Sequence, residues 1–474
     1  MAKFNKAATV AQPQVANLAG GAAYSQKAEE ELAFIALTSL VEDQFYRSGS
    51  DTLNRVKELV KQCTPEFVAK VAIYAREVGN MRSITHVLVG ELAEHAKGMD
   101  YLRNVVARVC KRPDDMAEIL SYWQSNYGKK NLPAALRFGL KEAFNKFNNY
   151  QLGKYGLSSH EWTMIDMINV IHPIPTEKNA LALREYITKG NHVVETWETE
   201  VSANGAEAWA DLLKDKKLGY MALLKNVRNI MKSGADVDEL CKQLTNEEAV
   251  KKSKQFPYRF YSAYKALLAE NTPQKVLNAV SRACDIAVSN APNLDNTLIA
   301  VDTSGSMFNR MSSNSEMQMV EAAFVLGASL FKGSDAELMT FDGDARYIKM
   351  ASDSSVLNIV DSQMKCHRGG STNMGKVFSR ANKAYDRIII LSDMQSWQGL
   401  NSQSALTEYK NRYACNPHVY VIDLAGYGTG QFKTTNNIHD IAGLTDKVFD
   451  VFETIERGSK GLLSKINAID IRNA

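Results

Sequence analysis

The chain has 474 residues, of which 45% are hydrophobic and 23% are charged, and its formal net charge is +3 at pH 7. This length predicts two or more domains with ample hydrophobic core, and the small net charge leaves room for a local basic patch but not for a wholly basic domain. No apolar run approaches the roughly 18 residues of a membrane span, and the N-terminus lacks an apolar signal core, so we expect a cytoplasmic protein without membrane attachment.

Residues 1–25 and residues 26–290 differ in their sequence pattern. The first segment is rich in Ala, Gly, Asn and Gln and is predicted to form an irregular N-terminal arm. From Ala28 onward, apolar residues recur three and four positions apart, which is typical of amphipathic helices. Proline follows Thr64 and Thr272 at breaks in this pattern, and such a pair favours the start of a helix. Many short helices joined by short turns predict stacked helix pairs over residues 26–290.

The pattern changes near Ala291, where strands begin to alternate with helices. The strand candidates are Thr297–Asp302, Ala336–Phe341, Arg387–Ser392 and His418–Asp423, and the helix candidates are Met317–Phe331, Met374–Tyr385 and Ser404–Asn411. This alternation predicts a doubly wound, mostly parallel sheet with helices on both faces, over residues 291–474. Ligands of such sheets bind at the carboxyl ends of the strands, where Asp302 and Asp393 are expected.

Three segments near predicted strand ends carry oxygen ligands. They are Asp302-Thr303-Ser304-Gly305-Ser306, the glycine-rich Gly369-Gly370-Ser371-Thr372-Asn373, and Ser392-Asp393. Carboxylates and hydroxyls are hard donors that suit Mg²⁺, Mn²⁺ or Ca²⁺ better than zinc, and Mg²⁺ is the ion that we expect. The predicted ligands are Asp302, Ser304, Ser306, Thr372 and Asp393, with Ser371 as an alternative to Thr372. A simpler interpretation is that Asp302 and Ser306 only cap a helix that begins beside them.

The oxygen-rich constellation resembles the metal-ion-dependent adhesion site of von Willebrand factor A (vWA) domains. The resemblance extends from about Thr297 to the end of the chain and implies a vWA-type domain. Two segments resemble enzymatic motifs but lack residues that those motifs require. The segment Gly370–Lys376 has P-loop spacing, but Val377 stands where Ser or Thr should bind Mg²⁺. Ser304 lies outside any Gly-x-Ser-x-Gly elbow, and phosphoester hydrolysis would lack a second metal and a general base, so we expect no enzymatic activity.

The helical part resembles the Ro ribonucleoprotein family, whose helical module is called TROVE. The resemblance is carried by Met81-Arg82-Ser83, by Ala134-Ala135-Leu136-Arg137 with Lys141 and Ala143-Phe144-Asn145, and by Lys154-Tyr155-Gly156 with Ser159-His160 and Ile171-His172-Pro173. It implies a ring of HEAT-like helix pairs whose two ends are bridged by the vWA-type domain. Ser158 departs from the family pattern, because relatives often carry tryptophan before the Ser-His pair.

The Ro resemblance implies a set of RNA-binding residues, namely Arg82, Arg137, Lys141, Lys154, Tyr155 and His160. Their chemistry agrees with this role. Arg137 and Lys141 are four positions apart and share one helix face, where both can bind phosphates. Tyr155 offers a stacking surface beside Lys154, and His160 can hydrogen-bond or stack. The alternatives are a solvated helix face for the Arg137–Lys141 pair, packing for Tyr155 and a helix start for His160.

The resemblance further implies what the protein binds. The family holds small noncoding Y RNAs on the outer surface of the ring and single-stranded 3′ ends of misfolded RNA in its hole, which places it in RNA quality control. We therefore expect a monomeric, cytoplasmic ribonucleoprotein component, with a nuclease or other protein as a further partner through the metal site. A rival hypothesis is a protein–protein adaptor, in which the metal captures an acidic side chain and the helices are only a scaffold.

Overall fold

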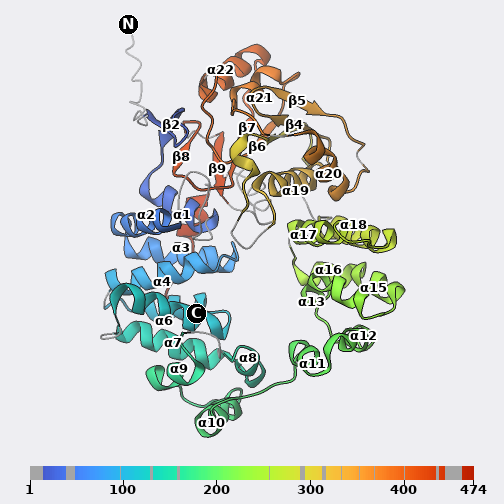
Figure 1. Cartoon of the computed structure of the whole chain (residues 1–474). Helices are drawn as coiled ribbons and strands as arrows, with labels where there is room; N and C mark the ends of the chain where they lie inside the picture. The colour runs from blue at the N-terminus through green and yellow to red at the C-terminus, as the bar shows by residue number, and fades with distance from the viewer. Residues whose placement is uncertain are drawn as a thin grey trace.

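Two stacks of helices and one sheet domain form a ring in the computed structural model (Figure 1). The structure describes residues 14–38, 49–96, 98–128, 132–156, 161–255, 257–288, 294–311, 316–332, 334–351, 353–367, 369–399, 401–433, 437–442 and 462–473. Within these ranges, no helix is long and apolar enough to cross a membrane.

The first stack contains the helices from residue 28 to residue 189 and has a hydrophobic core of its own. A typical start is that of α3, where the Thr64 side chain accepts a hydrogen bond from the Phe67 amide and Pro65 takes the first helical position. The helices are α1 (Ala28–Thr38), α2 (Gly49–Gln62), α3 (Pro65–Glu77), α4 (Ser83–His95), α5 (Leu102–Val109), α6 (Pro113–Tyr127), α7 (Ala134–Lys146), α8 (Asn149–Lys154), α9 (Met164–Ile171) and α10 (Ala180–Lys189).

The second stack follows after an extended connection and leads up to the sheet domain (Figure 1). Its elements are α11 (Trp197–Asn204), the 3₁₀ turn Gly205–Glu207, α12 (Ala208–Lys214), α13 (Tyr220–Lys225), α14 (Val227–Lys232), α15 (Val237–Leu244), α16 (Glu247–Ser253), α17 (Pro257–Leu268) and α18 (Gln274–Val288). No strand occurs among the described residues between 28 and 288, as the helical periodicity predicts.

The sheet domain has six strands in the order β5-β4-β3-β6-β7-β9, and all are parallel except β5. The four predicted strands have the predicted bounds: β3 (Thr297–Asp302), β4 (Ala336–Phe341), β6 (Arg387–Ser392) and β7 (His418–Asp423). Alternate residues of β3 pack on opposite faces of the sheet, so that Ile299 and Val301 join one core and Leu298 and Ala300 another. The prediction did not include β5 (Ala345–Ile348) or β9 (Ile438–Ala442).

Helices cover both faces of the sheet, which confirms the doubly wound arrangement. The helices of this domain are α19 (Met319–Phe331), α20 (Val356–Cys366), α21 (Gly375–Arg380) and α22 (Ser402–Tyr413), with a 3₁₀ turn at Gly305–Phe308. The expected helix Met374–Tyr385 is shorter, because side chains satisfy the backbone beyond Arg380. The Asn382 amide donates to the Tyr347 hydroxyl, and the Tyr385 amide donates to the Tyr409 hydroxyl.

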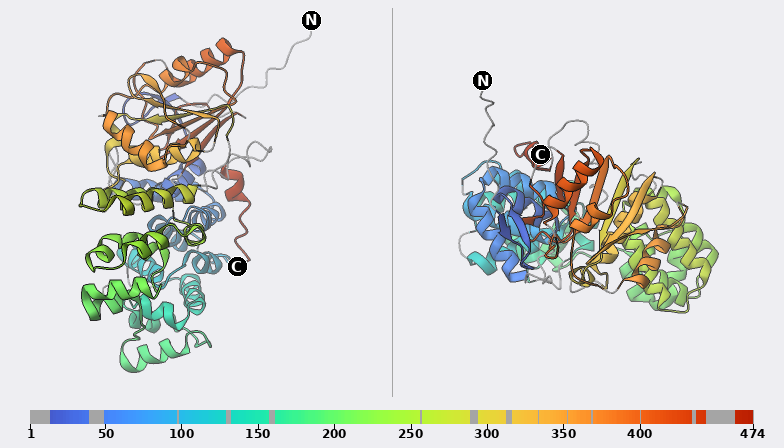
Figure 2. Two further views of the ribbon diagram at one scale, coloured as in Figure 1. Left: turned by 90° about the vertical axis from the view of Figure 1, so that its right-hand side faces the viewer. Right: turned by 90° about the horizontal axis from the view of Figure 1, so that it is seen from above.

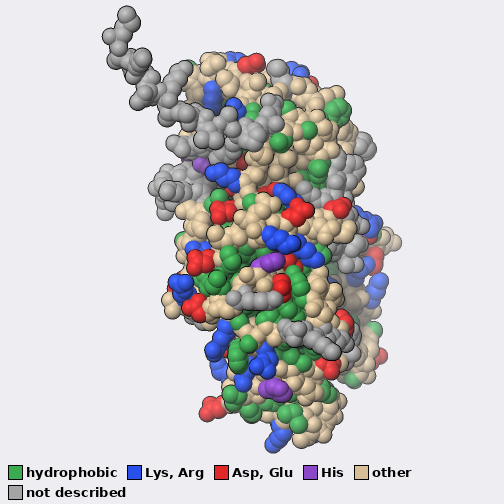
Figure 3. All heavy atoms as spheres, turned by 90° about the vertical axis from the view of Figure 1, so that its left-hand side faces the viewer, with side chains coloured by type: hydrophobic (Ala, Val, Ile, Leu, Met, Phe, Trp, Pro, Cys, Tyr) green, Lys and Arg blue, Asp and Glu red, His purple; other side chains and the backbone are tan. Residues whose placement is uncertain are grey.

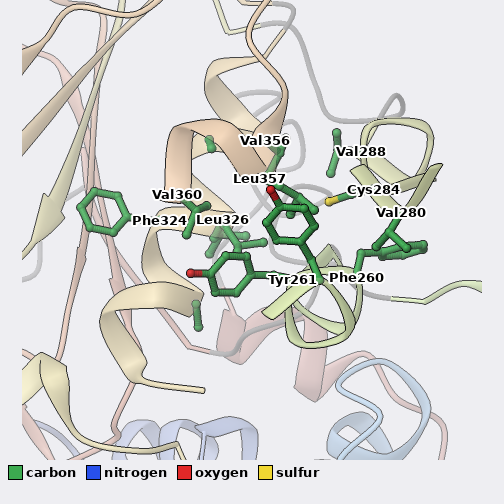
Figure 4. Close-up of a cluster of buried hydrophobic side chains, with 14 of the residues drawn as sticks. Phe260, Tyr261, Val280, Cys284, Val288, Phe324, Leu326, Val356, Leu357 and Val360 are labelled. Carbon is green, nitrogen blue, oxygen red and sulfur yellow. The ribbon is translucent and has the colours of Figure 1, made fainter. Parts of the chain in front are cut away.

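The second stack and the sheet domain share one continuous hydrophobic core. Side chains of α17 and α18, such as Phe260 and Val280, point toward Leu326 of α19 and Leu357 of α20 (Figure 4). A buried polar contact reinforces this joint, since Lys265 Nζ of α17 donates a 2.6 Å hydrogen bond to the carboxylate of Glu321 on α19. These two parts are therefore fused into one folding unit.

The first stack meets the sheet domain through different contacts. Residues 14–25, expected to be irregular, contain strands β1 (Gln14–Ala16) and β2 (Ala22–Ser25), and β2 pairs antiparallel with β8 (Thr429–Gly430). The C-terminal helix α24 (Leu462–Asn467) runs beside the first stack (Figure 2), where Leu462 and Ile466 enter its core. These chain ends close the ring together with α1, which lies beside β9 of the sheet domain.

Candidate functional site

The predicted metal ligands lie where the sheet changes its winding direction. From the central pair β3 and β6, later strands are added outward on opposite sides, which opens a crevice at their carboxyl ends. Asp302 is the last residue of β3, and Asp393 directly follows β6. The topology therefore brings together two carboxylates that are 91 positions apart in the sequence.

Asp302 is completely buried and is held by two hydrogen bonds. Its Oδ1 accepts from the Ser304 amide at 2.8 Å, and its Oδ2 accepts from the Ser392 hydroxyl at 2.6 Å. The Ser304 and Ser306 hydroxyls lie 3.4 Å apart on the turn that follows β3. The turn thus presents two hydroxyl oxygens beside an oriented carboxylate, and Ser392 is a supporting residue that the predicted ligand set did not contain.

Asp393 is 1% exposed and only partly satisfied. Its Oδ1 accepts a 3.2 Å hydrogen bond from the Gln395 amide, whereas its buried Oδ2 has no hydrogen-bond partner among the described residues. A buried carboxylate oxygen without a partner is costly unless a cation or water satisfies it. This oxygen is the feature of the site that most directly indicates a cation.

The electrostatics of the two carboxylates also indicate a bound cation. Burial raises the pKa of Asp302, and the nearby charge of Asp393 raises it further. Burial also raises the pKa of Asp393, while the Ser306 hydroxyl favours its ionised form. A divalent cation would reverse both shifts by neutralising the pair. Two carboxylates with serine hydroxyls form an oxygen-only donor set that fits a hard divalent cation.

The remaining predicted ligand lies on the glycine-rich loop, which contacts the turn after β3. The Gly305 amide donates a 2.8 Å hydrogen bond to the Gly370 carbonyl. Thr372 is buried, whereas the hydroxyl of the alternative ligand Ser371 donates to the Gln398 side chain. Across the described parts of the chain, no group of three or more His, Cys, Asp and Glu side chains gathers as a ligand cluster. The assignment of Thr372 as a ligand remains a prediction.

Arg137 and Lys141 lie one turn apart on α7, and both are partly exposed. Neither side chain forms an ion pair with another described residue. The Arg137 guanidinium lies over the ring of Phe138, 5.4 Å from its centroid, and Phe138 itself is 46% exposed. The pair therefore presents two cations and an aromatic face together. Figure 3 shows the flank formed by the first stack, where Lys and Arg side chains are interspersed with hydrophobic ones.

Arg82 has a structural role in addition to the predicted one. Its Nε donates a 2.7 Å hydrogen bond to Asp115, and a second guanidinium nitrogen lies 2.6 Å from Asp114. Asp115 is completely buried and also accepts hydrogen bonds from Arg76 and from the Arg112 amide. Although burial alone would raise it, these partners and His86 lower the pKa of Asp115 far below its usual range. The Arg82 side chain is 34% exposed, so one edge remains open to solvent.

Lys154 and Tyr155 lie at the end of α8, where the two stacks approach each other. Lys154 Nζ is 3.7 Å from the carboxylate of Glu198 on α11. The Arg112 guanidinium covers the Tyr155 ring at 4.5 Å from its centroid. Arg112 is not among the candidate residues predicted from the sequence. The pattern that could have indicated it is the Arg-Pro-Asp-Asp start of α6 at residues 112–115. The predicted contact His160 lies outside the described residues.

Comparison with known proteins identifies the family. The TROVE domain model matches residues 33–194 and 192–321, and the Ro60 vWA domain model matches residues 296–455. The chain belongs to the Ro family. Its TROVE segment contains all five described residues of the predicted RNA-binding set, and its Ro60-type vWA segment contains all five predicted metal ligands.

Two curated relatives and one solved structure are similar to this Ro-family chain at low sequence identity. Telomerase protein component 1 of Rattus norvegicus and of Mus musculus are each 22% identical over 333 residues, which cover 50% of this chain but only 13% of those proteins. The crystal structure of the Deinococcus radiodurans Ro (RSR) protein superposes with a TM-score of 0.61 over 91% of this chain and 100% of that chain. Its sequence identity is 15%, so it shows a shared fold.

Proposed function

We propose that this Ro-family chain is a non-catalytic RNA-binding protein and part of a ribonucleoprotein. The observation that carries the proposal is the pair Arg137 and Lys141, which are partly exposed on α7 within the TROVE match and form no ion pair with another described residue. An Arg–Lys pair without a carboxylate partner among the described residues favours phosphate, because arginine binds phosphate oxygens in a bidentate manner and lysine adds a point charge. The exposed ring of Phe138 beside them offers a stacking surface for a base.

The proposed ligands are a small structured, Y-like noncoding RNA on the outside of the ring and single-stranded 3′ ends of misfolded RNA in its opening. Supporting this division, the chain forms a ring of two stacks closed by a sheet domain (Figure 1). A ring that admits one strand and excludes a duplex would select RNA by shape, as proteins often do with unpaired ends. The corresponding role is RNA quality control by a monomeric, cytoplasmic protein.

The vWA-type site is proposed to bind a divalent cation, with Mg²⁺ the first choice. Asp302 and Asp393 would supply charge, and Ser304, Ser306 and Thr372 would supply neutral oxygens. The bound cation would offer a coordination position to an acidic side chain of a protein partner such as a nuclease.

Purification at low salt tests the proposal against the adaptor hypothesis. Material that carries RNA should show a high ratio of absorbance at 260 nm to that at 280 nm, and nuclease treatment should lower this ratio while EDTA leaves it unchanged. Protein free of nucleic acid that captures an acidic partner only in the presence of Mg²⁺ would instead favour the adaptor.

A further inference from the structure

A cavity of about 220 Å³ lies in the second stack, between α13, α14 and α17. Its lining comes from α13 and α14, which are separated by Asn226, and from α17, which contributes the small residues Ala263 and Ala266 three positions apart. The floor is apolar and consists of the buried side chains of Leu224, Val227 and Leu267. The cavity belongs to neither the metal site nor the predicted RNA-binding set.

Three cations surround this apolar floor, and the lining contains no carboxylate. Lys225 and Arg259 are exposed and form no ion pair with another described residue. Arg228 shares the single carboxylate of Glu270 with Lys232, at 3.3 and 3.2 Å. The rim is therefore net positive, which predicts an anionic ligand.

A neighbouring cavity in the second stack differs from the first in the charges that line it. It measures about 340 Å³ between α13, α15 and α16, and it also has three lysines, Lys216, Lys242 and Lys252. Its lining includes Glu239 and Glu248 as well, and Lys242 lies 4.0 Å from Glu239. The lining of this second cavity thus contains carboxylates beside its lysines, whereas the lining of the first cavity contains none.

The volume of the first cavity limits the size of its ligand, and its polar side chains indicate which groups the ligand carries. A volume of about 220 Å³ is below the roughly 300–1,000 Å³ that encloses a drug-sized molecule, so the expected occupant is no larger than about one ring system. Gln255 and Ser262 line the cavity and can hydrogen-bond to the edge of such a ring. Arginine planes such as those of Arg228 and Arg259 stack on nucleobases, and their charge favours the flanking phosphates.

We infer that this cavity is a single-nucleotide site, which takes one unstacked base of single-stranded RNA and holds the adjoining phosphates with Lys225, Arg228 and Arg259. The inference rests on the proposed RNA-binding function and extends it to the second stack. In Figure 1, α13 and α17 lie on the side of that stack nearer the first stack.

Binding of a labelled oligouridylate of about 12 nucleotides to the full chain, followed by fluorescence anisotropy, tests this inference. Lys225→Ala/Arg228→Ala/Arg259→Ala should weaken binding at least about tenfold and lower the slope of log affinity against log salt by about 2. The control Lys216→Ala/Lys242→Ala/Lys252→Ala removes the same charge from the neighbouring cavity and should change affinity less than about threefold. Ala266→Met, which fills the cavity without changing charge, should weaken binding about tenfold with an unchanged salt slope.

The outcomes separate this inference from the function on which it rests. If the wild-type chain binds no oligonucleotide even in dilute buffer, the proposed function fails and the inference fails with it. If the wild type binds and the two triple variants behave alike, or Ala266→Met binds normally while remaining folded by circular dichroism, only the single-nucleotide site is overturned. Displacement of the oligonucleotide by polyglutamate with equal affinity would also overturn it, in favour of an acidic peptide.

Discussion

Asn17 donates a 2.7 Å hydrogen bond from Nδ2 to the backbone carbonyl of Ser396, in the loop that follows the predicted metal ligand Asp393. The Ala19 amide donates to the Gln395 side chain of the same loop at 3.3 Å. The hairpin that precedes the first stack is thus docked on the loop that follows Asp393. This joint consists of short strands, of polar contacts and of α1, which lies beside β9, whereas the second stack is fused to the sheet by a shared core. If the ring opens, we expect it to open where the hairpin is docked.

Gly21→Ala should release the docked hairpin. An added Cβ at Gly21 would lie 2.1 Å from the Ser396 carbonyl oxygen, so the two backbones must separate. We expect faster amide hydrogen exchange in residues 14–25, with little change in α17 and α18. Gly219→Ala, where nothing lies within 4 Å of the added Cβ, is the matched control and should exchange like the wild type. Unchanged exchange in the Gly21 variant would show that this joint does not depend on close backbone contact.

Without a bound cation, the buried carboxyl pair Asp302 and Asp393 should destabilise the folded chain as pH rises. Burial raises the pKa of Asp302 to about 7 and that of Asp393 to about 6, from 3.8. A carboxyl with a raised native pKa contributes stability that is complete below its unfolded pKa and is lost as pH rises through the native value. In EDTA, the Tm of Asp302→Asn should therefore rise relative to that of the wild type between about pH 4 and pH 7.

Mg²⁺ at about pH 8 should raise the Tm of the wild type, because the cation binds the folded state only. Asp393→Asn should lose this Mg²⁺ response, and the exposed control Asp353→Asn should keep it. Differential scanning fluorimetry with Mg²⁺ or EDTA measures both effects. An equal Mg²⁺ response in the wild type and in Asp393→Asn would place the cation elsewhere.

Asp115→Ala should destabilise the first stack strongly. The change would leave Arg76 and His86 buried without their carboxylate, and loss of one partner of a buried ion pair costs about 3–5 kcal/mol. Urea unfolding should show this loss. Glu66→Ala, which removes an exposed ion pair with Arg472, should cost at most about 1 kcal/mol. A small cost for Asp115→Ala would mean that solvent readily satisfies the arginines.

Tyr155→Leu should weaken RNA binding about tenfold, because a base stacked on an aromatic ring contributes roughly 1–3 kcal/mol. Tyr155→Phe keeps the ring and its contact with Arg112 and should bind nearly as well as the wild type. Oligonucleotide titrations of both variants make the comparison. If Tyr155→Phe binds as weakly as Tyr155→Leu, then the hydroxyl and not the ring face is what the RNA contacts.

Much of the sheet domain could be predicted because its signals are local. The parallel strand Thr297–Asp302 is buried at every position and reads as a continuous apolar run, and its carboxyl end carries the Asp-x-Ser-x-Ser turn. The edge strand Ala345–Ile348 escaped prediction because it is short and partly exposed, and it depends on pairing with β4.

Long-range contacts could not be predicted from local patterns. Tyr24 pairs with Gly430 across the length of the chain, and nothing in the surrounding residues 14–25 indicates that partner. The ion pairs of Asp115 also join the start of α6 to the end of α3 and the start of α4, so Arg82 looks from the sequence like a free cation although the fold uses it structurally. The Ro resemblance supplied the ring, whereas hydrophobic periodicity alone predicted only stacked helices.

The central claim is that this ring binds single-stranded RNA through the Arg137 and Lys141 cations on α7. Equilibrium binding of an unpaired oligonucleotide and of the matching duplex, measured over a salt series, tests it most directly. Arg137→Ala/Lys141→Ala should weaken single-strand binding about tenfold and flatten the salt slope by about 1.4. Lys189→Ala/Lys251→Ala, which removes two lysines already paired with glutamates, should bind like the wild type. Unchanged affinity and salt slope in the Arg137/Lys141 variant, or wild-type protein that binds neither nucleic acid, would contradict the account.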